Sequence, residues 1–224
     1  KLERGDAENR KLWQKMVDIS MKNLEHSANM LGILPFDEHK GESSYEEDMP
    51  AIIKEALDKN VAVKKDDGSV VVDLSKEKLD EAVLIKSDGA STYLLRDLAT
   101  IKYRKKIHGF YKNLYVVDVR QEHHFRQVFC VAEKLGFEGS DESEHISYGL
   151  LKLPEGAVST RSGNVISIEK VITEAQNRAL KIIQQKNPGL ENKEEVARAV
   201  GLGALKYFDL SHNRKSDIEF RWDE

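Results

Sequence analysis

Apolar and polar positions follow helical spacing at both ends of the chain and change to alternating strands and helices in the middle. Apolar residues recur at three- and four-residue intervals over 7–32, which predicts an amphipathic helix. The same spacing is weaker over 45–59. Two short valine-rich runs flank Asp67-Gly68, a dipeptide typical of tight turns, and predict a small β-hairpin. Helical spacing returns over 168–186 and 193–210.

The central part of the chain alternates between two kinds of apolar pattern. Short strands are predicted over 82–86, 114–118 and about 145–152, and helices over about 91–106 and 121–135. This alternation favours an α/β fold in which a parallel sheet is connected by crossover helices. Ligands of such sheets bind beyond the carboxyl ends of the strands, so we expect the chemistry of this chain there.

Composition narrows the class of protein. The 224 residues are 40% hydrophobic and 33% charged, and no apolar run approaches the ~20 residues that span a bilayer. Cys130 is the single cysteine and lies in an apolar helical stretch, so we expect a buried thiol, no disulfide and a reducing, cytoplasmic environment. The net charge of −4 gives no general attraction to nucleic acid, so phosphate contacts would need a local basic patch.

The stretch 86–99 passes from a strand through a turn into a helix. Tyr93 and Asp97 are four residues apart and therefore share a helix face. A phenol beside a carboxylate suits a planar cation such as a guanidinium. An ordinary capped helix, with Asp97 solvated or paired to Lys102 or Arg104, also explains these residues, and the pattern alone favours this simpler interpretation.

The segment 118–127 closes the second central strand and opens the next helix. Gln121 and His124 lie one turn apart near the start of that helix, where backbone N–H groups favour an anion. They could orient a nucleotide or an amino acid. His123 and His124 are adjacent and point to different faces, so we expect no protein-bound metal and a partly exposed, structural His123.

Two polar segments nearer the carboxyl-terminal end could contact phosphate. The first is a loop of small hydroxyl residues, glycines and one arginine over 156–168, which could equally be an ordinary exposed turn. The second lies at 211–224, where interspersed acids make a solvated surface equally plausible. The candidate residues are Ser159, Thr160 and Arg161 in the loop, and His212, Asn213, Arg214 and Lys215 in the tail.

The order and spacing of these segments resemble the class I arginyl-tRNA synthetase family. Single motifs are weak, but their joint order along nearly the whole chain is specific. The resemblance is carried by Gly5 to Trp13, Gly41-Glu-Ser, Lys86-Ser-Asp-Gly, Tyr93, Arg96-Asp-Leu-Ala, Tyr115-Val-Val-Asp, Gln121, His124-Phe, Gln127-Val-Phe, His145, Tyr148-Gly, Ser159-Thr-Arg-Ser-Gly-Asn, Gly203-Ala-Leu-Lys-Tyr, Asp209-Leu-Ser, Asn213-Arg and Ser216-Asp-Ile.

The resemblance implies an α/β fold with a partial Rossmann-type parallel sheet and crossover helices, an α+β insertion before it and α-helices after it. Residues 1–81 would be the helical and hairpin insertion. Residues 82–167 would be the second half of the catalytic domain with its signature loop. Residues 168–224 would lead into a truncated anticodon-binding domain.

The resemblance also implies roles for individual residues. Tyr93 and Asp97 would hold the guanidinium of substrate arginine, and Gln121 would help to hold the amino acid. The loop residues Ser159, Thr160 and Arg161 would stabilise the pyrophosphate leaving group. The residues expected near ATP are His124, Tyr148, Gly149 and Ser159.

The implied reaction joins L-arginine to ATP, as its Mg²⁺ complex, to form arginyl-adenylate, and then transfers arginine to tRNA(Arg) in a protein that we expect to be monomeric. Two departures matter. The signature loop has Ala157, Val158 and Thr160 where lysine, methionine and lysine would stand, and no His-x-Gly-His occurs in the sequence. We therefore expect a fragment that is inactive by itself. The alternatives are a non-catalytic tRNA- or protein-binding module and a cysteinyl-type synthetase; Asp97 and the single cysteine argue against the latter.

Overall fold

The computed structural model describes residues 6–153, 156–157 and 167–223. Their contacts form two compact units. We call residues 40–150 and 214–218 the central unit, and the described parts of 1–39, 151–213 and 219–224 the helical unit. The predicted boundary after residue 81 falls inside the central unit, where two paired strands lie on either side of it.

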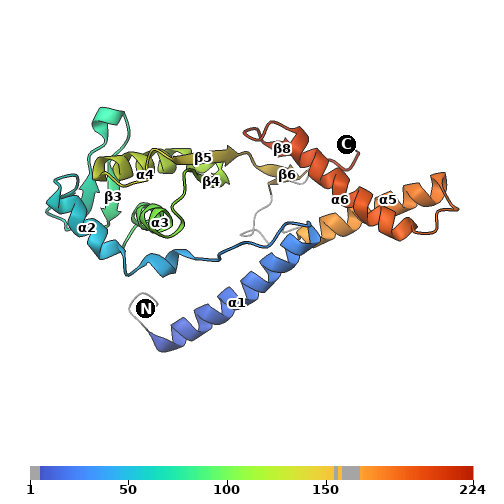
Figure 1. Cartoon of the computed structure of the whole chain (residues 1–224), viewed down its shortest axis with the longest axis horizontal. Helices are drawn as coiled ribbons and strands as arrows, with labels where there is room; N and C mark the ends of the chain where they lie inside the picture. The colour runs from blue at the N-terminus through green and yellow to red at the C-terminus, as the bar shows by residue number, and fades with distance from the viewer. Residues whose placement is uncertain (1–5, 154–155, 158–166, 224) are drawn as a thin grey trace. The chain divides into compact units, whose positions relative to one another are not determined.

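The central unit contains three strands in one antiparallel sheet, a parallel pair of strands and three α-helices (Figure 1). Short 3₁₀ turns, labelled η, link some of them. In chain order the elements are η1 (Glu42–Tyr45), α2 (Met49–Asp58), β1 (Val63–Lys64), β2 (Val70–Val72), η2 (Ser75–Glu77), β3 (Ala82–Ile85), α3 (Tyr93–His108), β4 (Asn113–Asp118), η3 (Val119–Gln121), α4 (Glu122–Leu135) and β5 (Ser143–Tyr148).

The predicted hairpin is confirmed, and its turn lies where the sequence places it. β1 pairs antiparallel with β2, and the Lys65 amide donates to the Ser69 carbonyl at 2.9 Å. Gly68 has φ +87°, a left-handed backbone conformation that glycine adopts without steric cost. Asp67 Oδ1 closes the turn by accepting from the amide of Ser69 at 3.0 Å.

The sheet differs from the prediction in one respect. The strand expected at 82–86 forms as β3, but it pairs antiparallel with β2 and not parallel with β4. The reason is that β2 is buried along its whole length and precedes β3 by ten residues, so the local antiparallel partner satisfies the strand. The parallel pairing that was predicted is confirmed for β4 and β5, in register from Asn113↔Ser143 to Asp118↔Tyr148.

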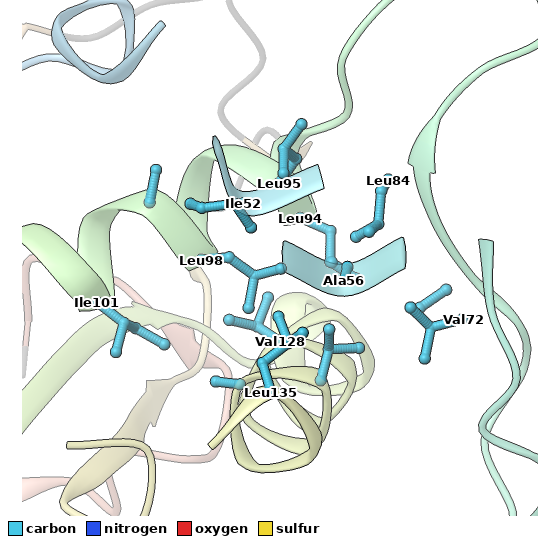
Figure 2. Packing of buried hydrophobic residues seen from close by; sticks show 14 of the residues in the cluster. Ile52, Ala56, Val72, Leu84, Leu94, Leu95, Leu98, Ile101, Val128 and Leu135 are labelled. Atoms are coloured by element: carbon cyan, nitrogen blue, oxygen red, sulfur yellow. The ribbon is translucent and has the colours of Figure 1, made fainter. Parts of the chain in front are cut away.

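The core of the central unit lies where α3 meets α2, the antiparallel sheet and α4. Figure 2 shows Leu94, Leu95 and Leu98 of α3 among side chains from the three other elements. Leu95 and Leu98 are fully buried, so replacement of either by alanine would cost about 2–5 kcal/mol. Their labelled neighbours in Figure 2 include Ile52 and Ala56 of α2, Val72 of β2, Leu84 of β3, and Val128 and Leu135 of α4.

The predicted strand over 145–152 is interrupted. β5 ends at Tyr148, and a separate three-stranded sheet in the order β7-β6-β8 begins after Leu150. Gly149 lies at the break and has no strand partner of its own. The strands of this separate sheet are β6 (Leu151–Leu153), β7 (Gly156–Ala157) and β8 (Ile218–Glu219). In β8, Ile218 belongs to the central unit and Glu219 to the helical unit.

The helical unit contains the three helices predicted at the two ends of the chain. α5 and α6 pack closely, since a Cβ on Gly201 of α6 would lie 2.7 Å from the backbone of Gln176 in α5. Asp6 caps α1 by accepting from the Asn9 amide at 3.0 Å. None of the described helices combines the length and apolarity needed to cross a membrane. The helices are α1 (Ala7–Met30), α5 (Ile168–Lys186) and α6 (Lys193–Ser211).

Candidate arginine pocket

Local hydrogen bonds fix the start of α3 against the end of β3. The turn after β3 has Gly89 at φ +82°, and Asp88 Oδ1 accepts from the Ala90 amide at 2.9 Å. Thr92 is the N-cap of α3, where its hydroxyl accepts from the Leu95 amide. The same hydroxyl donates to the carbonyl of Val83 in β3 at 2.7 Å. The first turn of the helix is therefore tied to the strand before it.

Tyr93 and Asp97, in the first and second turns of α3, line one cavity of about 400 Å³. Gln121 and His124, at the junction of β4 with α4, line the same cavity. The Tyr93 residue is 67% exposed and the Asp97 side chain 27% exposed, so the phenol lies at the rim and the carboxylate deeper. The structure thus brings four of the predicted site residues together around one space.

Asp97 contacts His124 and neither of the two cations that the simpler interpretation offered. His124 Nε2 lies 2.6 Å from Asp97 Oδ2. Lys102 instead pairs with Glu55 at 2.6 Å, and Arg104 donates to the amide oxygen of Asn113 at 3.2 Å. The Asp97 carboxylate therefore has the His124 imidazole on one oxygen and is not paired with either of these two cations.

The two adjacent histidines point to different groups, as their spacing predicts. His123 lies 3.4 Å from Asp80 and its side chain is about half exposed, whereas His124 faces the cavity. Across the described residues, no three His, Cys, Asp or Glu side chains gather in a way that could hold a metal ion. Cys130, expected to be buried, is partly buried, and that burial raises the pKa of its thiol.

Another part of the cavity lining comes from residues to which the sequence analysis assigned no role in a site. Lys40 lies before η1, and its ammonium is 3.7 Å from the ring centroid of Tyr103, a cation–π contact that holds this segment on α3. Glu42 of η1 lies 3.6 Å from the Arg96 guanidinium. No local pattern links residue 40 to residue 97, so this part of the lining could not be read from the sequence.

One side of the cavity could have been found in part from helical spacing. Tyr93, Asp97, Thr100 and Arg104 are separated by four, three and four residues, so they form one stripe on α3, and all four line the cavity. Tyr115 of β4 also lines the cavity. Burial raises the pKa of Tyr115 to about 12, despite the nearby Asn113 amide and Arg104 guanidinium, so the phenol stays neutral.

The segment 214–218, which we call the tail strap, is hydrogen-bonded to the residues that follow β5, including the predicted site residue Gly149. The Gly149 amide donates to the Arg214 carbonyl at 2.7 Å, and the Leu150 amide donates to Asp217 Oδ1 at 2.9 Å. The Arg214 guanidinium in turn donates to the carbonyl of Ser147. Arg214, a candidate for tRNA contact, thus has an intramolecular partner at the end of β5, beside Tyr148.

None of the remaining predicted residues that the structure describes is among those that line the cavity. His212 and Asn213 belong to the helical unit by contact, and the His212 ring hydrogen-bonds the carbonyl of Phe208. Lys215 lies in the tail strap and is exposed. Ser159, Thr160 and Arg161 lie outside the described residues, so the predicted signature loop stays a prediction.

Comparison with known proteins decides the family. A family model described as "tRNA synthetases class I (R), catalytic domain" matches residues 1–222. The chain belongs to the arginyl-tRNA synthetase family. The resemblance drawn from the ordered motifs is therefore confirmed, and the match extends through the helices after residue 168.

Relatives in this family are similar over the entire chain. The arginine–tRNA ligase of Clostridium botulinum (strain Alaska E43 / Type E3) is 42% identical over 224 residues, and that of Lactococcus lactis subsp. cremoris (strain MG1363) is 41% identical over 224 residues. The chain spans 39% of the length of each of these two ligases.

Solved structures of arginyl-tRNA synthetases share the fold. The structure from Plasmodium falciparum covers 99% of this chain with a TM-score of 0.83 at 22% identity, and the chain covers 37% of it. That from Thermus thermophilus covers 80% of this chain with a TM-score of 0.66 at 24% identity, and the chain again covers 37%. The predicted α/β class is thereby confirmed.

Proposed function

We propose that this chain supplies the side-chain pocket for L-arginine in an arginine–tRNA ligase. The observation that carries the proposal is the position of Asp97, whose carboxylate lies inside a cavity with Tyr93 at its rim and Gln121 beside it. A guanidinium is a planar fork of N–H donors that pairs with a carboxylate through two parallel hydrogen bonds. The neutral phenol and amide can orient the rest of the side chain.

The surroundings of the Asp97 carboxylate suit it to binding a cation. The carboxylate lies in the second turn of α3, near the helix N-terminus, whose dipole stabilises a negative charge. His124 supplies a hydrogen-bond donor to one carboxylate oxygen in its Nε2–H form. A cation that enters the cavity would therefore find a carboxylate that is already oriented, so little reorganisation would be needed on binding.

The proposed reaction is the activation of arginine by ATP and its transfer to tRNA(Arg). An oxygen of the arginine carboxylate attacks the α-phosphate of Mg²⁺-ATP, the bond to the β-phosphate breaks, and pyrophosphate leaves. A hydroxyl of the terminal tRNA ribose then displaces AMP from arginyl-adenylate. The protein's contribution to such steps is positioning and charge stabilisation, so no side-chain nucleophile is assigned.

The nucleotide and tRNA contacts belong to the same proposal. We assign His124, Tyr148, Gly149 and Ser159 to the surroundings of ATP, with Thr160 and Arg161 on the pyrophosphate. His212, Asn213, Arg214 and Lys215 are the candidate tRNA contacts. For Arg214 to contact tRNA through its guanidinium, the hydrogen bond from that group to the Ser147 carbonyl would first have to break. We further propose that the whole protein is a cytoplasmic monomer, in keeping with its single, partly buried cysteine.

Substitution of Asp97 tests the proposal. In the 224-residue chain, Asp97→Asn keeps the size of the side chain and removes its charge. We expect arginine affinity to fall by about 30- to 150-fold, which corresponds to about 2–3 kcal/mol and is the lower range for breaking a buried charge pair, because Asp97 is partly exposed. The measurement is titration of ¹⁵N-labelled chain with L-arginine, followed by amide chemical shifts.

Asp80→Asn is the matched control, since Asp80 lies outside the cavity and is 91% exposed. Its arginine affinity should equal that of the unmodified chain. Equal arginine binding by Asp97→Asn and Asp80→Asn would contradict the role of Asp97. A folded chain that shows no saturable shift changes with arginine would contradict the proposed pocket as a whole.

A further inference from the structure

The buried hydroxyl of Tyr115 has no hydrogen-bond partner within the described part of the chain. Tyr115 is 6% exposed, and its hydroxyl is the one buried side-chain polar atom that stands alone in this way among the described residues. Buried polar groups are almost always paired, because an unpaired one loses its bonds to water without replacement. Such a group in a residue that lines a cavity calls for an explanation.

The aromatic ring explains the position of Tyr115 but not its hydroxyl. The ring packs on Phe125 and Phe129 of α4, with centroid distances of 4.8 and 5.6 Å. A phenylalanine would make the same contacts. The packing around Tyr115 therefore accounts for its aromatic ring and not for its hydroxyl.

Arg104 and Asn113 lie near the Tyr115 phenol, but each has another hydrogen-bond partner. Arg104 lies over the Tyr115 ring, with its guanidinium carbon 5.1 Å from the centroid, and donates to Asn113 Oδ1 at 3.2 Å. The amide nitrogen of Asn113 donates to the Ser143 hydroxyl at 3.2 Å. Thr100, the remaining polar residue of the α3 stripe on this side, donates its hydroxyl proton to the Arg96 carbonyl at 2.9 Å.

The donors of a bound arginine outnumber the acceptors of Asp97 that face the pocket. A guanidinium carries five N–H donors, of which a paired carboxylate accepts two. The others need acceptors once the side chain is enclosed, or they carry the cost of lost hydration. Tyr115 lines the same cavity as Asp97, and its phenol oxygen, which is closed to solvent in the ligand-free chain, accepts no hydrogen bond from the described residues.

We infer that the Tyr115 hydroxyl accepts a hydrogen bond from the guanidinium of bound arginine, in the pocket that Asp97 and Tyr115 both line. This inference rests on the proposed function, because it takes arginine as the ligand. Tyr115 then contributes to specificity for arginine. Its unpaired hydroxyl destabilises the ligand-free protein, and the same hydroxyl gains a hydrogen bond when arginine binds.

The inference predicts that Tyr115→Phe weakens arginine binding without lowering the melting temperature of the ligand-free chain. Tyr115→Phe removes the hydroxyl and keeps the ring. The ligand-free chain should melt at the same temperature or higher, since no hydrogen bond is lost and a desolvated oxygen is removed. Arginine affinity should fall by about ten- to a hundredfold, as expected for a hydrogen bond to a charged group.

The experiment compares the unmodified chain, Tyr115→Phe and the control Tyr111→Phe by thermal unfolding and by titration with L-arginine. Tyr111 is 85% exposed and does not line the cavity, so its substitution should change neither quantity. Weaker arginine binding by Tyr115→Phe without loss of melting temperature supports the inference.

Two results overturn the inference while leaving the proposed function intact. One is unchanged arginine affinity of Tyr115→Phe when the unmodified chain binds arginine. The other is a lowered melting temperature of Tyr115→Phe, which means that the hydroxyl already has a stabilising partner in the free protein. If the folded, unmodified chain does not bind arginine, that result overturns the proposed function, and with it the inference that rests on it.

Discussion

The contact between Gly149 and the tail strap supports a sharp prediction for Gly149→Ala. A Cβ at this position would lie 2.1 Å from the carbonyl oxygen of Ser216 and 2.7 Å from the amide nitrogen of Asp217. Both are backbone atoms, so no side-chain rotation relieves the clash. Gly149 has no positive φ, so alanine fits its own backbone conformation and the effect comes from the strap alone.

The size of the effect follows from the hydrogen bonds that would be lost. Displacement of the strap removes the bonds Gly149–Arg214 (2.7 Å), Leu150–Asp217 (2.9 Å) and Ile218–Leu150 (2.9 Å). Each hydrogen bond contributes about 1 kcal/mol, so the closed position of the strap becomes less stable by on the order of 3 kcal/mol. This change raises the open population roughly a hundredfold.

Trypsin cleavage measures this opening directly, because the strap contains Arg214 and Lys215. Cleavage requires local opening, and its rate follows the open population when reclosing is fast. We expect Gly149→Ala to be cut at these two residues up to about a hundredfold faster than the unmodified chain, at low protease concentration.

Gly203→Ala is the matched control. Gly203 lies inside α6, and a Cβ there meets nothing within 4 Å, so alanine should stabilise the helix by about 0.5–1 kcal/mol and leave cleavage in the strap unchanged. The reasoning is refuted if Gly149→Ala is cut at Arg214 and Lys215 as slowly as Gly203→Ala.

Two further predictions concern pH and activity. Hydrogen bonds from Lys102 and Lys59 lower the pKa of Glu55, so this carboxylate stabilises the fold above its unfolded pKa of about 4.5, and that contribution is lost as pH falls through the lowered folded value. Chemical denaturation should therefore show Glu55→Gln less stable by about 1 kcal/mol or less at pH 7, because the partners are half exposed, and no less stable at acid pH; a constant difference across pH would contradict this. The 224-residue chain has no His-x-Gly-His motif, so it should show no arginine-dependent ATP–pyrophosphate exchange above a Tyr93→Ala/Asp97→Ala double variant, and measurable exchange would disprove the expected inactivity.

Helices were predictable from the sequence because each carries its own signals. The expected helix at 168–186 is observed with those bounds, capped by Ser167, and the predicted helix at 7–32 is observed as 7–30. Apolar spacing and capping side chains act within a few residues, so a local pattern is sufficient to place such elements.

Strand pairing was less accessible because it is decided by distant residues. The pattern identified β3 as a strand, but its antiparallel partner β2 depends on the burial of the hairpin. The cavity, too, could be predicted only in part. The spacing of Tyr93 and Asp97 placed them on one face, whereas Lys40 and Tyr115 reach the cavity only through tertiary packing.

The double role of Thr92 has a consequence for how the pocket is assembled during folding. Its hydroxyl joins β3 to the start of α3, and β3 is held by the hairpin that precedes it, so the position of Asp97 is set by contacts among residues 63–97. Contacts this close in sequence form early and with little loop-closure entropy. The carboxylate side of the pocket can thus take shape before β4 and α4 are in place, and they close around a helix that is already oriented.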